Sequence, residues 1–194
     1  MVNGILFAVP LWTAKKKRRR KPAKMREDTL NNLRVVLNRM AEYELALAEL
    51  YLTCSQIWPD NKYFWILMER GEVKHAQYID KITKMVTEKP EAFELGRPFK
   101  PATIQISISG VRWNLQRLKN KEITERNMLF ISRDIEQSFL ESRYGEILKT
   151  SETDFQSFMN EILLDTLAHR EFLNDKIKER QALTEDHLIA ARMR

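Results

Sequence analysis

Apolar residues recur at alternating steps of four and three over two long stretches, and this pattern constrains the fold more than any other feature. The first stretch covers residues 33–58, and the second, with the same rhythm, covers residues 65–86. Side chains at such spacing lie on one face of an α-helix. Between the stretches, Pro59-Asp60-Asn61 is a sequence typical of a turn. The chain therefore begins with two long amphipathic helices joined by a short turn, and Asp28 or Thr29 is the expected N-cap of the first.

The middle of the chain is predicted to be a long connection. Residues 88–102 contain three of the chain's six prolines and one of its five glycines, which indicates a non-helical link. Residues 103–120 then favour a shorter helix, although residues 103–108 (TIQISI) alternate in polarity as a short strand would. No proline follows Pro101, which argues against a turn-rich sandwich or barrel.

Two further helices are expected over residues 124–148 and 153–181. Four long helices that are paired by turns at 59–61 and 149–153, with a long crossover in the middle, predict an all-α fold. The specific expectation is a four-helix bundle of ferritin-like connectivity over residues 29–181. Residues 182–194 are predicted to be a polar, frayed C-terminal extension.

The net charge of +6 lies almost wholly in residues 1–28, which carry nine Lys or Arg and two acidic residues. The remainder is close to neutral, so no specific nucleic-acid partner is expected. An apolar segment before the basic run makes the tail a candidate for weak membrane or phosphate contact. The alternatives are a disordered extension, or a segment that precedes an internal start at Met25.

One cysteine, Cys54, cannot form an intramolecular disulfide. Together with the absence of a recognisable signal sequence, this favours a reducing, cytoplasmic setting.

Three ionisable residues fall on the apolar faces of the first two helices: Glu44, Glu72 and His75. An unpaired charge at such a position is costly, so a compensating partner is expected. The separation of three residues places Glu72 and His75 on the same helix face, where a carboxylate oxygen and an imidazole nitrogen can converge on one cation. The alternative is an ordinary ion pair within the helix at a partly exposed edge.

The second half of the chain repeats the pattern. Glu44 precedes His75 by 31 residues, and Glu136 precedes His169 by 33. A two-helix unit used twice would bring both Glu/His pairs to the centre of a bundle, as in di-iron and di-manganese carboxylate proteins. Thr166 stands where the second Glu-x-x-His motif would have its Glu. Simpler interpretations remain: His169 as a core histidine bonded to Thr166 or a backbone carbonyl, and Glu136 as the salt partner of Arg143.

The motifs ELALAELY, ERGEVKHA, DIEQSFLESRY and DTLAHREFL resemble those of the rubrerythrin-like branch of the ferritin-like superfamily. The resemblance covers residues 29–178 and implies a di-iron centre that reacts with oxygen or peroxide. Its implied metal ligands are Glu44, Glu72, His75, Glu136 and His169, with Glu72 as the bridging carboxylate. The chain departs from the family at Thr166 and in having no cysteine-rich rubredoxin module.

The resulting prediction is an iron-binding protein with an oxidoreductase or Fe(II)-oxidising activity, and manganese is the other candidate metal. The site is expected to hold either a di-iron centre or, if the half with Thr166 is lost, a single iron bound by Glu44, Glu72 and His75. The family resemblance implies a homodimer, and the missing rubredoxin module implies a separate electron-donor protein. Tyr51, seven residues after Glu44, is expected in the core with its hydroxyl near a ligand carboxylate. The competing hypothesis is a metal-free bundle that serves as a structural or protein-interaction module.

Overall fold

The computed structural model describes residues 25–137 and 141–192. Residues 1–24 of the predicted tail, 1–28, lie outside them, and the last two tail residues, Glu27 and Asp28, belong to the first helix. Within the described residues the chain is mostly helical, which confirms the all-α prediction. The elements in chain order are α1 (Glu27–Ile57), α2 (Lys62–Glu88), β1 (Phe93–Leu95), α3 (Pro101–Lys119), α4 (Glu125–Glu136), β2 (Leu148–Thr150) and α5 (Thr153–Arg192). Short 3-10 turns occupy Pro59–Asn61, Pro90–Ala92 and Glu141–Glu146. None of the described helices is long and apolar enough to cross a membrane.

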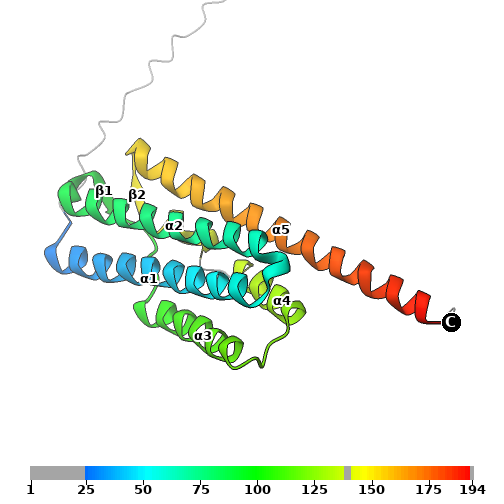
Figure 1. Ribbon diagram of the computed structural model, residues 1–194. Coiled ribbons are helices and arrows are strands. Elements are labelled where there is room, and N and C mark those ends of the chain that lie inside the picture. The colour runs from blue at the N-terminus through cyan, green and yellow to red at the C-terminus, as the bar shows by residue number, and fades with distance from the viewer. Residues whose placement is uncertain (1–24, 138–140, 193–194) are drawn as a thin grey trace, which may run out of the picture.

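Helices α1 and α2 form an antiparallel pair, as the two apolar stretches predict (Figure 1). Their facing side chains, such as Leu47 and Ile79, are fully buried. The turn at Pro59–Asn61 reverses the chain because proline lacks the N–H that would continue the first helix. The first helix begins earlier than expected: its N-cap is Arg26, not Asp28 or Thr29, and no side chain caps it.

Residues 103–108 are helical, so the short strand considered from their alternation is not formed there. They begin α3, with Pro101 in the first turn, where a missing N–H costs nothing. Ile104 and Ile108 are buried one helical turn apart, followed by Val111 and Leu115, and this face packs on α1. The spacing of four outweighs the alternation because it extends over the whole segment.

The prediction of a third long helix over residues 124–148 is wrong for the second half of that range. Helix α4 ends at Glu136, residues Glu141–Glu146 form a 3-10 helix, and residues Leu148–Thr150 form β2. This strand pairs antiparallel with β1, with Phe93 opposite Thr150 and Leu95 opposite Leu148. The short two-stranded sheet thereby ties the crossover to the segment before α5.

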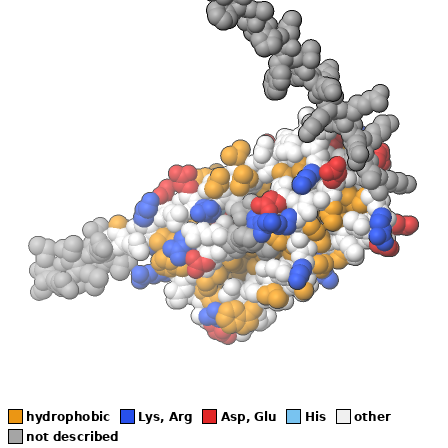
Figure 2. Space-filling view, turned by 180° about the vertical axis from the view of Figure 1, so that it is seen from behind, with side chains coloured by type: hydrophobic (Ala, Val, Ile, Leu, Met, Phe, Trp, Pro, Cys, Tyr) orange, Lys and Arg blue, Asp and Glu red, His pale blue; other side chains and the backbone are white. Residues whose placement is uncertain are grey.

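Helix α5 continues to Arg192, so the frayed extension expected from residue 182 is helical instead. Its inner face packs on α2 and α4, with buried contacts up to Ile177. In Figure 1 its C-terminal part projects beyond the other helices. On the face shown in Figure 2, side chains of both charge signs alternate with apolar ones, as expected from the near-neutral body of the chain.

Candidate metal centre

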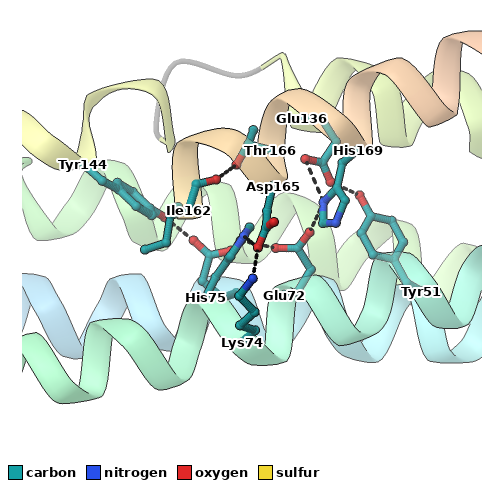
Figure 3. A network of polar contacts seen from close by, with 11 residues as sticks. Tyr51, Glu72, Lys74, His75, Glu136, Tyr144, Ile162, Asp165, Thr166 and His169 are labelled. Carbon is teal, nitrogen blue, oxygen red and sulfur yellow. Dashed lines mark hydrogen bonds and ion pairs between the residues drawn. The ribbon is translucent and has the colours of Figure 1, made fainter. Parts of the chain in front are cut away.

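The five predicted ligand residues come together in the interior, between four helices. Figure 3 labels four of them: Glu72, His75, Glu136 and His169. Glu44 lies on α1, Glu72 and His75 on α2, Glu136 on α4 and His169 on α5. Glu44, Glu72 and His75 are fully buried, and Glu136 and His169 are 2% and 5% exposed. Each residue lies on the inner face of its helix. The cluster therefore forms because the helical spacing of the sequence turns these side chains toward the interior.

One half of the cluster is formed by α1 and α2. The Nδ1 atom of His75 lies 3.2 Å from Oε2 of Glu72 and 3.8 Å from Oε2 of Glu44. One oxygen or nitrogen atom from each residue falls within a group small enough to surround a cation. A nitrogen and two carboxylate oxygens thus converge on one point.

The other half uses the second oxygen of Glu72. The Nδ1 atom of His169 lies 2.9 Å from Oε1 of Glu72 and 3.6 Å from Oε2 of Glu136. Glu72, Glu136 and His169 form the second group that could hold a metal ion. Glu72 therefore belongs to both halves, with Oε2 directed to one and Oε1 to the other, as a bridging carboxylate would be.

The inner atoms of the cluster are short of hydrogen bonds. Among the described residues, Oε2 of Glu44, Oε1 of Glu72, Oε2 of Glu136 and Nδ1 of His169 have no hydrogen-bond partner. Although His169 and Glu72 approach to 2.9 Å, the contact lacks hydrogen-bond geometry. Two ligands bound to one metal at about 2.1 Å and at 90 to 110° would lie roughly 3.0 to 3.4 Å apart. The observed separations run from 2.9 to 3.8 Å and include this range, so these atoms could face a common ion.

Two tyrosines hold the outer oxygens of the terminal carboxylates. The Tyr51 hydroxyl donates a 2.7 Å hydrogen bond to Oε1 of Glu136, and the Tyr144 hydroxyl donates a 2.6 Å hydrogen bond to Oε1 of Glu44. The first bond confirms the expected position of Tyr51. Each tyrosine comes from the opposite half of the chain, so each bond ties the two halves together. Hydrogen bonds of this kind orient metal-ligating carboxylates.

The electrostatics of the cluster depend on Glu72, which lies between the two histidines. Burial opposes its ionisation, but the close contacts of its oxygens with the imidazoles of His169 and His75 outweigh burial and lower the pKa of Glu72. Burial likewise opposes the charged form of each histidine, yet the neighbouring carboxylates raise the pKa of His75 to about 11 and that of His169 to about 10.

The terminal carboxylates are shifted the other way. Burial raises the pKa of Glu44 to about 8 and also raises the pKa of Glu136. Without a metal ion, protons on the histidines and on Glu44 therefore compensate the charge of the cluster at neutral pH. A metal ion would replace those protons.

The simpler interpretations of the second half do not describe the observed contacts. The Thr166 hydroxyl donates to the carbonyl of Ile162, and the Nδ1 atom of His169 faces Glu72 and Glu136. Arg143 pairs with Glu146, while Glu136 accepts its hydrogen bond from Tyr51.

Asp165 does not take the place of the missing carboxylate beside Thr166. It is 31% exposed and forms a 2.6 Å ion pair with Lys74, and its nearest approach to Nε2 of His75 is 3.7 Å. The cluster therefore has one carboxylate that is shared by its two halves, Glu72, and an ion pair at its edge.

Two residues at the site were not predicted from the sequence. A Cβ atom on Gly71 would lie 2.3 Å from Nε2 and 2.4 Å from Cε1 of His169, so only glycine leaves room for that ring. This glycine directly precedes the Glu-x-x-His motif, and a helical glycine beside a ligand motif is the signal that could have drawn attention to it. Tyr144 had no comparable signal, because its position depends on the irregular segment after α4.

No protein-family model, curated protein or solved structure matches this chain. The resemblance to rubrerythrins therefore stays a prediction from the motifs.

Proposed function

We propose that this protein is a rubrerythrin-like, ferritin-like metalloprotein that binds two metal ions, iron in the first instance, in the Glu/His cluster. The single observation that carries the proposal is the set of buried carboxylate and imidazole atoms that face one another without hydrogen-bond partners among the described residues. Buried ionisable groups are normally paired or bound to a metal. The pairing of α1 with α2 and of α4 with α5, with a crossover between them, supports a ferritin-like four-helix bundle.

The donor set fits iron or manganese. Three carboxylates and two imidazoles are hard to borderline ligands, and a site without thiolates suits these metals better than copper(I) or iron–sulfur clusters. Glu44 and His75 would hold one ion, Glu136 and His169 the other, and Glu72 would bridge them. An iron pair bound there would supply redox chemistry with oxygen, peroxide or additional Fe(II).

The residues of this chain would bind, orient and shield the ions. Four helices exclude bulk water from the ligands, and the hydroxyls of Tyr51 and Tyr144 hold the terminal carboxylates in place. The Thr166 hydroxyl donates a 2.9 Å hydrogen bond to the backbone carbonyl of Ile162, and Thr166 would supply no second bridging carboxylate.

A metal-free structural or protein-interaction module is the second candidate, and one observation favours it. His75 and Glu72 form a 3.2 Å hydrogen bond, and protons on the histidines can compensate the buried carboxylates without any metal. In that case the cluster would be a buried polar network that ties the helices together.

The experiment that separates the two candidates is metal analysis of the full chain after anaerobic Fe(II) loading. We expect about two irons per chain in the wild type and loss of iron in Glu72→Ala and His169→Ala. Glu49→Ala, which changes an exposed carboxylate on α1, is the control and should retain both ions. Oxygen and peroxide consumption by the loaded protein then tests the redox activity. A wild-type protein without iron would overturn the metalloprotein proposal and leave the interaction module.

A further inference from the structure

We propose that Trp58, Trp65 and Tyr51 form a one-electron path from the protein surface to the Glu136 side of the metal centre. A reduced one-electron carrier protein would deliver electrons at Trp58. The physiological use of the path rests on the proposed function, but the path itself belongs to the polypeptide and can be tested without metal.

The three rings are in contact in series. Trp58 is half-buried at the end of α1, next to the turn into α2. Its ring centroid lies 5.9 Å from that of Trp65, which is fully buried, and the Trp65 centroid lies 6.0 Å from that of Tyr51. The Tyr51 hydroxyl then donates a 2.7 Å hydrogen bond to Oε1 of Glu136. An unbroken chain of contacts thus connects the surface to a proposed metal ligand.

The chemistry of these side chains suits electron transfer. Indole and phenol rings lose one electron far more readily than a phenyl ring does, and tunnelling slows exponentially with distance. Several short steps through touching rings are therefore faster than one long step through aliphatic core. Phe64 also contacts Trp65, with centroids 4.9 Å apart, but its phenyl ring cannot serve as a carrier.

The protons have defined positions along the path. Oxidation of Tyr51 requires loss of its O–H proton, and Oε1 of Glu136 is the acceptor already bonded to it. Among the described residues, Nε1 of Trp65 has no hydrogen-bond partner, so its N–H proton has no acceptor. Oxidised Trp65 would keep this proton and remain a strong one-electron oxidant. It would pass the charge on and would not trap it.

Each transfer would balance in electrons and protons. Tyr51 would give one electron to an oxidised metal centre held by the cluster and its proton to Oε1 of Glu136. Trp65 would then return an electron to Tyr51, which would recover the proton, and Trp58 would return an electron to Trp65. The carrier protein would lose one electron in total, and the three aromatic residues would end unchanged.

The other half of the centre offers a matched control. Tyr144 donates an equivalent hydrogen bond to Glu44, but its ring lies edge-on against Phe99, a residue that cannot carry an electron. Loss of the Tyr144 hydroxyl should therefore disturb a ligand carboxylate without interrupting the path.

The first experiment uses metal-free, full-length protein and a flash-generated tris(bipyridine)ruthenium(III) oxidant. In a background with Trp12, Trp113, Tyr63 and Tyr78 changed to Phe, the remaining indoles are Trp58 and Trp65, and the remaining phenols are the buried Tyr43, Tyr51 and Tyr144. Transient absorption should show an indole radical that decays as a tyrosyl radical forms, at a rate independent of protein concentration. The experiment measures the electronic coupling between neighbouring rings, and this coupling is the same for electron transfer in either direction along the path.

Four variants in that background test the path. Trp65→Phe should lengthen the life of the Trp58 radical by an order of magnitude, Tyr51→Phe should remove the tyrosyl signal, and Tyr144→Phe should leave both unchanged. Trp58→Phe alters a half-buried residue and keeps the experiment informative if Trp65→Phe unfolds. This variant should abolish the transfer in which an indole radical decays as the tyrosyl radical forms. An unchanged rate in Trp65→Phe, or loss of the tyrosyl signal in Tyr144→Phe, would overturn the proposal.

The second experiment measures reduction of the iron-loaded, oxidised protein by stopped flow, with dithionite as the probe. Trp65→Phe should slow bleaching of the ferric absorption by an order of magnitude at unchanged iron content. An equal rate at equal iron content would contradict a role in reducing the centre. A protein that binds no iron would instead overturn the proposed function, while the flash experiment would still decide whether the path exists.

Discussion

Gly71 and His169 depend on each other, because the imidazole ring occupies the space that a β-carbon at position 71 would need. We expect Gly71→Ala to push the ring away from Glu72 and to cost about 1–3 kcal/mol of unfolding free energy, as overpacking typically does. Iron bound by the Glu136 half should be lost as well. Chemical denaturation and metal analysis measure the two effects.

Gly110→Ala is the control for this variant. It also replaces a glycine inside a helix, but nothing lies within 4 Å of the added Cβ. We expect this change to stabilise the protein by about 0.5–1 kcal/mol through helix propensity. If Gly71→Ala behaved in the same way, the close approach of His169 would not exist in solution.

The two tyrosines at the centre should influence metal affinity and not ligand number. Tyr51→Phe and Tyr144→Phe each remove one hydrogen bond to a ligand carboxylate. Loss of such an outer contact typically lowers metal affinity by about 10- to 100-fold. Competition with a chelator under anaerobic conditions measures the change, and Tyr63→Phe, at a residue that is 74% exposed, should have no effect. Equal affinity in all three variants would show that the hydroxyls do not orient the ligands.

The spacing of the ligand residues in the sequence was sufficient to predict that they meet in the interior. The positions of residues around each helix decide which side chains face inward. Glu44, Glu72 and His75 are at positions where an apolar residue was expected, and that discrepancy identified them. The need for glycine at position 71 could not be predicted in the same way. It depends on the distance between two helices, which single-chain periodicity does not contain.

At the level of elements, the β1–β2 pair holds the segment that carries Tyr144. A Cβ on Gly96 would lie 2.1 Å from the backbone oxygen of Glu146, and backbone atoms cannot move aside as a flexible side chain can. Gly96 also donates a 2.8 Å backbone hydrogen bond to Ile147. We expect Gly96→Ala to separate the strands, with an overpacking cost of about 1–3 kcal/mol.

Hydrogen exchange at residues 93–95 and 148–150, together with thermal denaturation, tests this prediction. Exchange should accelerate at both strands in Gly96→Ala. The matched variant Gly145→Ala adds a methyl group where nothing lies within 4 Å, and its exchange should match the wild type. Unchanged protection in Gly96→Ala would contradict the observed strand contact.

The early end of α4 explains why this part of the fold was not predicted. The apolar spacing of residues 124–148 is compatible with a continuous helix, but the last residues pair with β1, which lies more than fifty residues earlier in the chain. Such a three-residue strand is formed by its partner and not by local propensity. The interruption matters for the site, because it places Tyr144 within 2.6 Å of Glu44.

For the whole molecule, a bound metal would join the α1–α2 pair to the α4–α5 pair, since its ligands come from all four helices. A metal that binds only the folded chain stabilises it by about 2.7 kcal/mol at a free concentration one hundred times the Kd. Chelation should therefore lower the Tm of iron-loaded wild type, whereas Glu72→Ala should be indifferent to chelator. Calorimetric scans with and without chelator measure this difference, and an unaffected wild type would argue for the interaction module.

The size of that stabilisation should depend on pH in a direction set by the cluster. In the metal-free protein the pKa values of His75 and His169 are raised from 6.5 to about 11 and about 10. Their contribution to stability is fully present below about pH 6.5 and is lost as pH rises through the folded-state values. Glu44 acts in the same direction, because its pKa is raised from 4.5 to about 8 and the folded chain retains a proton that the unfolded chain has released.

Metal binding reverses this dependence, because the ion must displace the protons on both histidines and on Glu44, and displacement becomes easier as pH rises. We therefore expect the Tm difference between iron-loaded and metal-free protein to widen from about pH 6 to about pH 9. Titration in buffers of different ionisation enthalpy should also show that protons are released as the metal binds. A Tm difference that stays constant or narrows with rising pH would mean that the metal is held outside the Glu/His cluster.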